Sequence, residues 1–484
     1  MNLKSTKVQV LSQEPLCFVI DRDLLDLDNR LDTWFFHPRF TPLLEALAAT
    51  KFEVLEIGDT RISSRVVDGI HKTPKYTDKG LVFIQVNNIR EGEVDFITNT
   101  KRVAADWENQ VLRRYSGESG DVLVTKDGTI GIAAVVPEEH PRFSIFVSVA
   151  AIKPNKEYVL PMYLATVLNT GIGQLQIDRY KRGAVLSHLL LEEIKRIEIP
   201  LPPRPIQVKV ANIMQDAYEF RKGKLRESKY LIESIDNFVL EAFGIKPVES
   251  ERRLAYSVQL EEDARARIDP AFYSPRYLSL LDALKRSSHL LKPLGEISST
   301  ITSGARPKGG VKYIKEGVPS IGGEHITFNG SFDFGQLRYI PKSFHEKLKK
   351  SWVKPFDVLL VKDGATTGKV ALVGEDFPFK QCNINEHVFR IELEEGYNPY
   401  YIFSFLFSKL GQEQIKRLSS GAAQKGITND AIRKIMIVVT EEIQNKVASE
   451  VQKRIEGSRK LREDALRAVI EAKTEAERII AGYY

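Results

Sequence analysis

The stretch "DVLVTKDGTIG" at residues 121–131 returns later in the chain as "DVLLVKDGATTG" at residues 357–368. In both copies a short apolar run ends in Lys-Asp-Gly, which is typical of a strand that closes in a turn. The copies lie roughly 237 positions apart, whereas a solenoid repeats every 20–50 residues or so. The phrase therefore predicts a whole module that is used twice.

Four further blocks keep the same offset. "RLDTWFFHPRF" at 30–40 matches "RIDPAFYSPRY" at 267–277, and Gly80 and Ile84 match Gly317 and Ile321. "RYKRGAVLSHLLLEEIKRIEIPLP" at 179–202 matches "RLSSGAAQKGITNDAIRKIMIVVT" at 417–440, and "IQVKVA" at 206–211 matches "IQNKVA" at 443–448. Chance similarity would not hold one register over so many blocks, so the sequence indicates a duplication.

The composition is that of a globular protein without a disulfide framework. The chain has 484 residues, of which 43% are hydrophobic, and only two cysteines. Its first residues lack the apolar segment of a secretory signal, and its apolar runs are shorter than the roughly 18 residues of a membrane helix. We expect a cytoplasmic protein.

The excess positive charge lies in one part of the chain. The net charge is +6, while residues 268–440 alone carry +7 and residues 30–203 carry 0. A basic segment of this kind permits a nucleic-acid partner without proving one.

Each half contains a mixed segment followed by a long helical pattern, so the sequence predicts an α+β fold with two tandem α/β modules. Apolar residues at spacings of three and four predict two helices of about 40 residues, or about 60 Å each. We expect the helices to pack antiparallel as a coiled-coil spacer with pseudo-twofold symmetry, because so long an apolar stripe needs a partner. The predicted segments are an N-terminal arm (1–29), the first module (30–203), helix one (204–243), a linker (244–267), the second module (268–440) and helix two (441–484).

The predicted seam between the helices, or between them and partner subunits, consists of apolar residues from both stripes. Helix one contributes Val210, Ile213, Ile235 and Val239, and helix two contributes Val447, Val451, Ile455 and Leu461.

A search for catalytic and metal-binding signatures yields none. "YNPYY" at 397–401 lacks the second proline of an adenine methyltransferase loop, and "GATTGK" at 364–369 is one residue short of a P-loop. The repeated Lys126-Asp127-Gly128 and Lys362-Asp363-Gly364 resemble an active-site pair, but a turn that needs glycine explains them better. We therefore predict no catalytic residue, no metal and no cofactor.

The loops instead carry side chains suited to DNA. Arg, Lys and Gln reach base edges in the major groove, and Ser and Lys serve phosphates. The candidates in the first module are Arg65, His71, Lys72, Lys75, Asn87, Asn88, Arg179, Lys181 and Arg182. The candidates in the second module are Arg306, Lys308, Glu324, His325, Ser420, Gln424 and Lys425.

From about residue 30 to 480 this pattern resembles the DNA-specificity subunit of type I restriction–modification enzymes. The most specific stretches are "IEIPLPPRPIQ" at 197–207, "VLLVKDGATTGKVALV" at 358–373 and "GVPSIGGEHI" at 317–326. The resemblance implies a subunit without catalytic residues whose two target-recognition domains read the halves of a split, asymmetric sequence in double-stranded DNA. It also implies that the helices set the unread spacer and dock two methyltransferase subunits, to which restriction subunits can add.

The sequence departs from the family pattern at the joints between module and helix. Arg204, Pro205 and Ile206-Gln207 replace the usual Leu-x-Glu-Gln, and "VVTEEIQNK" at 438–446 lacks the proline cluster. Two other functions stay open at this point. One is a symmetric adaptor between proteins with no DNA role, and the other is the specificity half of a degenerate DNA-modifying enzyme.

Overall fold

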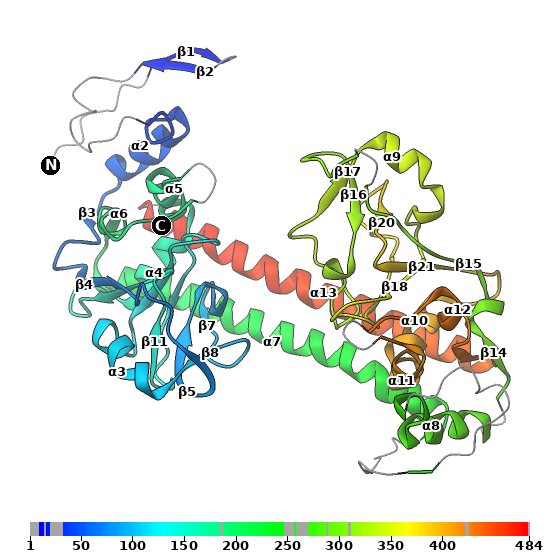
Figure 1. Cartoon of the computed structure of the whole chain (residues 1–484). Helices are drawn as coiled ribbons and strands as arrows, with labels where there is room; N and C mark the ends of the chain where they lie inside the picture. The colour runs from blue at the N-terminus through cyan, green and yellow to red at the C-terminus, as the bar shows by residue number, and fades with distance from the viewer. Residues whose placement is uncertain are drawn as a thin grey trace. The chain divides into compact units, whose positions relative to one another are not determined.

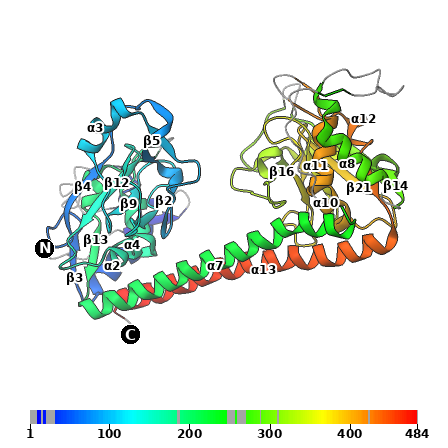
Figure 2. The ribbon, with the colours of Figure 1, turned by 90° about the horizontal axis from the view of Figure 1, so that it is seen from below.

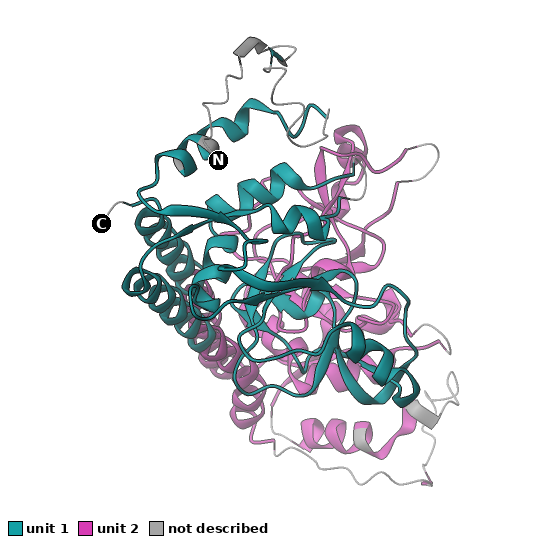
Figure 3. Ribbon diagram, turned by 90° about the vertical axis from the view of Figure 1, so that its left-hand side faces the viewer, with its two compact units in different colours: residues 1–223, 464–484 teal, residues 224–463 magenta. Residues whose placement is uncertain are grey.

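The computed structural model places the chain in two compact units (Figures 1 and 3). It describes residues 9–13, 16–19, 32–183, 187–245, 256–257, 270–286, 289–307, 311–421 and 425–482. Unit 1 contains residues 1–223 and 464–484, and unit 2 contains residues 224–463. Each unit thus combines one module with part of both long helices.

Unit 1 is built on a four-stranded sheet in the order β10-β9-β12-β4 and a three-stranded sheet in the order β11-β5-β8. Strands β13 and β3 form a separate pair, as do β6 and β7, and β1 and β2. The strands are β1 Gln9–Gln13, β2 Leu16–Val19, β3 Glu53–Glu56, β4 Ser63–Asp68, β5 Tyr76–Ile84, β6 Ile89–Arg90, β7 Glu93–Val94, β8 Lys101–Val103, β9 Val122–Thr125, β10 Ala133–Val135, β11 Phe143–Ile145, β12 Val149–Pro154 and β13 Glu198–Leu201. The helices are η1 Pro38–Phe40, α2 Thr41–Ala49, η2 Val86–Asn88, α3 Ala105–Arg114, α4 Pro161–Asn169, α5 Gly171–Tyr180 and α6 Leu191–Lys195.

Unit 2 repeats this topology. Its four-stranded sheet has the order β15-β21-β18-β19, its three-stranded sheet has the order β17-β16-β20, and β14 pairs with β22. The strands are β14 Leu291–Pro293, β15 Ser298–Ser303, β16 Val318–Ile321, β17 Arg338–Ile340, β18 Val358–Val361, β19 Val370–Leu372, β20 Asn383–Ile384, β21 Val388–Leu393 and β22 Met436–Val438. The helices are η4 Pro270–Tyr273, α8 Pro275–Arg286, η5 Leu294–Glu296, η6 Gly323–His325, α9 Lys342–Lys347, η7 Lys349–Ser351, α10 Pro399–Phe407, α11 Lys409–Leu418 and α12 Asn429–Ile432.

The repeated phrase forms a buried central strand and a glycine turn in both units. All four residues of β9 and of β18 are buried, and burying one such Val or Leu contributes about 1.5–3 kcal/mol. Gly128 and Gly364 have φ values of 67° and 88°, a conformation that favours glycine. The phrase is therefore a strand followed by a turn, as the sequence predicts.

The same turn also attaches the second repeated block. The backbone N–H of Leu189 donates to the carbonyl of Lys126, and the N–H of Ile427 donates to the carbonyl of Lys362. The two blocks recur together in the sequence because they form one hydrogen-bonded structure in each unit.

The long helices are α7, Arg204–Ala242, and α13, Glu441–Ile480, and they lie side by side in Figures 1 and 2. In unit 2 the hydroxyl groups of Ser228 and Ser458 lie 2.8 Å apart, and Arg454 donates to the hydroxyl of Ser234 at 2.9 Å. Ser228 on α7 meets Ser458 on α13, whereas Ser234, further along α7, meets Arg454, which comes earlier on α13. The two helices therefore run antiparallel.

Each helix pair is part of the core of its unit. In unit 2, residues Ile235 and Val239 share one buried cluster with Val447 and Val451 and with the module's sheet and helices. In unit 1, Val210 belongs to a second cluster together with residues from the far end of α13, namely Val469, Ala476, Ile479 and Ile480. Because the helices are antiparallel, Val210 and Ile213 near the start of α7 face the C-terminal end of α13. Val447 lies at the opposite, N-terminal end of α13.

Candidate nucleic-acid interface

Two variable loops leave the modules at corresponding positions, directly after β4 and β15. A Cβ atom on Gly69 would lie 1.8 Å from the carbonyl oxygen of Ile145, and one on Gly304 would lie 1.7 Å from that of Ile384. Only glycine permits so close an approach between the strand end and its neighbour. This approach fixes the starting point of the loop, and the side chains that follow differ between the modules.

In the first module, the loop begins at a buried carboxylate. Asp68 accepts hydrogen bonds from Lys126 at 2.8 Å and from Arg114, and His71 Nε2 lies 3.4 Å from it. Burial by itself would raise the pKa of Asp68, but the hydrogen bonds and charges of Lys126 and Arg114 outweigh it and lower the pKa. The carboxylate is therefore ionised at neutral pH and holds three basic side chains around the loop.

In the second module, the same place is occupied by a different set of charges. Arg306 Nε lies 3.4 Å from Glu386 Oε1, and His387 Nε2 lies 3.6 Å from that oxygen. His387 Nδ1 is in turn 2.5 Å from Oδ1 of Asp363, a residue of the repeated phrase. The loop after β15, the turn before β21 and the repeated phrase thus meet in one cluster.

A second exposed pair adjoins this cluster. Arg338 Nη2 lies 3.8 Å from Glu324 Oε1, and the Arg338 guanidinium lies 5.6 Å from the centre of the Tyr313 ring. The pKa of Tyr313 is raised by its burial and by the nearby charges of Glu386 and Glu324. Tyr313 therefore lies near both Arg–Glu pairs.

Five of the first module's predicted DNA-binding residues are exposed, as a readout surface requires. They are Arg65, His71, Lys72, Lys75 and Asn87. The Lys72 ammonium lies 5.4 Å from the centre of the Trp107 ring, which extends the loop toward α3.

The four other predicted residues of the first module make contacts within the fold. Asn88 is fully buried, and its side chain accepts from the backbone of Gln85. The guanidinium of Arg179 stacks 3.9 Å from the centre of the Phe35 ring and donates to the Phe35 carbonyl. Lys181 pairs with Asp178, and Arg182 pairs with the buried Glu193. Asn88 and Arg179 are thus occupied within the fold, whereas the Lys181 and Arg182 side chains are 33% and 45% exposed and stay predicted DNA contacts.

The Arg179 contact has an equivalent in unit 2, where Arg417 stacks 4.0 Å from the centre of the Phe272 ring and donates to the Phe272 carbonyl. The pattern of an early aromatic residue and a later arginine is thus a structural contact within each module. This contact gives both blocks a structural reason to recur.

The predicted residues of the second module have mixed positions. Arg306, Glu324, Ser420 and Lys425 are exposed, while His325 is 2% exposed. His325 Nδ1 accepts from Gly322 N–H and its Nε2 faces the Gln336 carbonyl, so it is a framework residue and not a DNA contact. Lys308 and Gln424 lie outside the described residues.

Sequence reasoning missed several residues that the fold brings to this surface. Glu386 and His387 lie between β20 and β21, Arg338 lies in β17, and Tyr313 lies in the connection from β15 to β16. The sequence does mark two of them: in "NINEHVF" at 383–389, Glu386 and His387 interrupt a pattern of apolar strand residues just before β21.

A basic hollow lies beside the Arg306 loop. It has a volume of about 480 Å³ and is lined by Thr302–Ala305 and by residues 346–351, which include Lys347, Lys349 and Lys350 and one carboxylate, that of Glu346. These lysines account for part of the second module's charge of +7. Lysine ammonium groups at a backbone-lined hollow are suited to phosphate oxygens.

We expect the triple substitution of Lys347, Lys349 and Lys350 by Gln to weaken binding to every duplex to a similar extent. The slope of log affinity against log salt should become shallower by about 0.9 for every phosphate that the wild-type lysines neutralise. The measurement is a salt titration of duplex binding by fluorescence anisotropy. An unchanged slope would show that these lysines do not bind phosphates.

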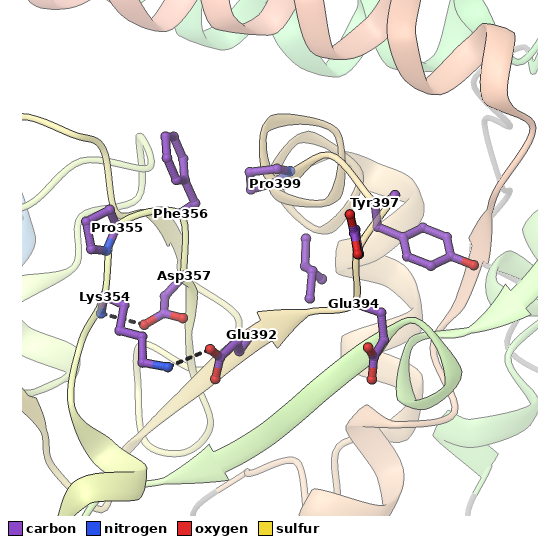
Figure 4. Close-up of a pocket in the computed structure, with 11 residues that line it drawn as sticks. Lys354, Pro355, Phe356, Asp357, Glu392, Glu394, Tyr397 and Pro399 are labelled. Carbon is purple, nitrogen blue, oxygen red and sulfur yellow. Dashed lines mark hydrogen bonds and ion pairs between the residues drawn. The ribbon is translucent and has the colours of Figure 1, made fainter.

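A pocket elsewhere on unit 2 has the opposite character (Figure 4). It measures about 380 Å³, and Glu392, Glu394 and Glu395 contribute carboxylates to its lining. Lys354 neutralises one of them through a 2.6 Å bond to Glu392, which Figure 4 marks with a dashed line. The remaining negative charge at this pocket repels phosphates.

The helix pairs expose large apolar residues in both units. Their exposed fractions range from 40% to 71%, and the residues are Val208, Phe220, Leu466 and Ile470 in unit 1, and Leu225 and Tyr230 in unit 2. Scattered exposed apolar residues are normal, but six of them on two helices are consistent with a surface that another protein covers.

The described residues contain neither a membrane span nor a metal cluster. No helix there is both long and apolar enough to cross a membrane. Within the same residues, no three His, Cys, Asp or Glu side chains gather in a way that suits a metal ion.

Comparison of the sequence with known proteins identifies a family. The family model "Type I restriction modification DNA specificity domain" matches residues 74–227 and 291–472. The chain is 23% identical over 158 residues to the specificity subunit of the type I restriction enzyme EcoBI from Escherichia coli, an alignment that covers 33% of each protein. It is 27% identical over 171 residues to a putative MjaX specificity subunit from Methanocaldococcus jannaschii, covering 34% of this chain and 39% of that protein. The chain thus spans between a third and two fifths of the length of the curated relatives it matches.

Solved structures give weaker similarities. The S subunit of a type I system from M. genitalium is 14% identical with a TM-score of 0.42, and 89% of this chain and 96% of that one are covered. The HsdS subunit from Thermoanaerobacter tengcongensis is 15% identical with a TM-score of 0.31, and the coverage is 90% and 97%.

Proposed function

The chain belongs to the type I restriction–modification DNA-specificity family, and on this basis we propose that it is a non-catalytic subunit that reads a split target in double-stranded DNA. In this proposal residues 30–203 and 268–440 are the two target-recognition domains, and each reads one half of the target. The subunit needs no cofactor for this task and works in the cytoplasm, where its DNA lies.

One observation carries the proposal. The modules share their sheet order and their hydrogen bonds at the repeated phrase, yet the loops after Gly69 and Gly304 carry different charged clusters. A conserved framework with different side chains at the same place is expected if each module recognises a different base sequence. A symmetric adaptor that binds two copies of one protein would need equal loops instead.

The exposed residues divide into two roles. Arg306, Lys72 and Asn87 are of the types that hydrogen-bond to base edges in the major groove. Lys347, Lys349 and Lys350 are placed to contact phosphates, which hold the protein in register but specify no base.

We further propose that the helix pairs dock two methyltransferase subunits, to which restriction subunits can add. The support is the set of exposed apolar residues on α7 and α13, which includes Phe220, Tyr230 and Ile470. A duplicated chain offers two equivalent surfaces, and two copies of one partner can bind such surfaces. In this proposal the helices also set the length of the unread spacer.

We expect Arg306→Ala to relax specificity in one half of the target and to leave the other half unchanged. Removal of a bidentate hydrogen bond to a base lowers discrimination by about 1–3 kcal/mol at that position. Lys72→Ala is the matched change in the first module, and it should affect the opposite half or only the overall affinity. The measurement is methylome sequencing of cells that carry each variant together with its methyltransferase.

Four results would contradict the proposal. If Arg306→Ala altered both halves, or if the target were continuous, two independent readers would not exist. If the full chain together with its methyltransferase gave no salt-dependent gel shift, the adaptor function would replace DNA recognition. Methyl transfer by the isolated chain would indicate an enzyme.

A further inference from the structure

The second module pairs its exposed arginines with carboxylates, which is unusual for a surface that meets DNA. The Arg306 side chain is 64% exposed and the Glu386 side chain 27% exposed. Among the described residues, Glu386 is the ion-pair partner of Arg306, and it faces the Nε atom. The two terminal nitrogens of the guanidinium therefore keep their donors for another acceptor.

Glu386 is held by a well-defined turn between β20 and β21. The backbone N–H of Asn385 donates to the Ile321 carbonyl, the N–H of Gly304 donates to the Asn385 carbonyl, and the Asn385 side chain accepts from the N–H of His387 at 2.9 Å. These bonds attach the turn to β16 and to the start of the Arg306 loop. The positions of Arg306 and Glu386 are thus fixed by the same residue, Asn385.

One oxygen of this carboxylate lacks a partner. Glu386 Oε1 lies near Arg306 and His387, whereas Oε2 is buried and makes no hydrogen bond to any described residue. Because Oε2 is buried, Oε1, which lies beside the exposed Arg306 side chain, is the oxygen left for a base edge.

We propose that Arg306 and Glu386 together read one guanine–cytosine base pair in the half of the target that the second module recognises. Arg donates in bidentate fashion to guanine O6 and N7, and Glu accepts from the N4 amino group of cytosine. In the major groove, guanine presents hydrogen-bond acceptors and the paired cytosine presents a donor beside them. An arginine next to a glutamate supplies the matching donors and acceptor. This inference rests on the proposed function and assigns to it a base pair and a residue, Glu386.

The charge pattern favours a base pair over a phosphate as the ligand of Arg306. A phosphate next to Glu386 would be repelled by the carboxylate, whereas the neutral edge of a G·C pair offers one acceptor face and one donor face. In the hollow beside the loop, three lysines outnumber the single carboxylate of Glu346, so this hollow suits a phosphate better.

The first module lacks the pair at the corresponding place. The backbone N–H of Lys126 donates to the Ser148 carbonyl, and the N–H of Lys362 donates to the His387 carbonyl. Ser148 and His387 therefore correspond, and so do the residues before them, Val147 and Glu386. An apolar Val147 cannot accept from cytosine. The inferred contact is therefore specific to the second half of the target.

The test compares Glu386→Gln with Glu394→Gln in the full chain together with its methyltransferase. Both variants remove one negative charge from unit 2 without changing side-chain size, but Glu394 is exposed and lies at the acidic pocket. Each protein selects targets from a randomised duplex pool, and the selected pool is sequenced. A thermal unfolding curve for each variant shows whether the fold is intact.

We expect Glu386→Gln to lower discrimination at a single G·C pair by about 5- to 150-fold, which corresponds to about 1–3 kcal/mol. Arg306→Ala should relax the same base pair, and Glu394→Gln should select the wild-type target. The inference is wrong if Glu386→Gln also selects the wild-type target, or if it weakens binding to all sequences alike. If the wild-type protein selects no motif at all, the proposed function itself fails.

Discussion

Lys126→Met should lower the unfolding free energy of unit 1 by about 3 kcal/mol. Lys126 lies in the phrase that both modules share, but we expect this large effect only for the copy in unit 1. Lys126 is 7% exposed and Asp68 is 3% exposed, and their side chains are joined by a 2.8 Å hydrogen bond. Removing one partner of a buried ion pair leaves an uncompensated charge, which costs about 3–5 kcal/mol. We expect the lower end of this range because Arg114 still contacts Asp68.

The matched control is Lys362→Met, the same change in the other copy of the phrase. Lys362 Nζ lies 4.0 Å from Asp363, and both side chains are 27% exposed. A long and partly exposed pair of this kind contributes about 0–1 kcal/mol, so this variant should keep nearly the stability of the wild type.

Fluorine NMR of protein labelled with 5-fluorotryptophan can measure both variants. Trp34 and Trp107 report on unit 1 and Trp352 on unit 2, so urea unfolding of each unit is followed separately in the whole chain. Equal loss of stability in the two variants would mean that the repeated lysine has the same role in both modules.

The pH dependence of unit 1 gives an additional check of the Asp68 site. The pKa of Asp68 is lowered in the folded state, so its contribution to stability is present above the unfolded-state value of about 3.9 and is lost as the pH falls through the folded value. Acidification from pH 7 to pH 3 should therefore reduce the unfolding free energy of unit 1 more in the wild type than in Lys126→Met.

Ile235→Asp should unfold unit 2, with a loss of several kcal/mol. Ile235 is fully buried in a cluster that contains α7, α13 and the core of the second module. A carboxylate placed there has no partner and no water, which makes its ionised form very costly. The helix seam and the module core form one continuous cluster, so we expect the module itself to lose stability and not the helix packing alone.

Tyr230→Asp is the control for Ile235→Asp. Tyr230 lies on the same helix but is 71% exposed, so its replacement should change the unfolding free energy of unit 2 by less than about 1 kcal/mol. Hydrogen exchange of the β18 amides should accelerate strongly in Ile235→Asp and stay slow in Tyr230→Asp. Protected β18 amides in the Ile235 variant would show that the module core is independent of the helices.

The sequence alone determined the features that depend on local pattern. The repeat at a constant offset gave the two modules, the spacing of three and four gave the long helices, and the Lys-Asp-Gly run gave the strand and turn. Such features are readable because burial of one face imposes a period on the chain and because positive φ values require glycine.

Only the tertiary structure decided which charged side chains are free to meet a ligand. In the sequence Arg179 and Arg306 look alike, but the Arg179 guanidinium stacks on the Phe35 ring, whereas Arg306 remains 64% exposed beside Glu386. The reason is physical: a loop side chain pairs with whatever charge the fold brings within a few ångströms, and those partners lie far away in the sequence. Composition and periodicity do not reveal which residues, distant in the sequence, the fold brings close together in space.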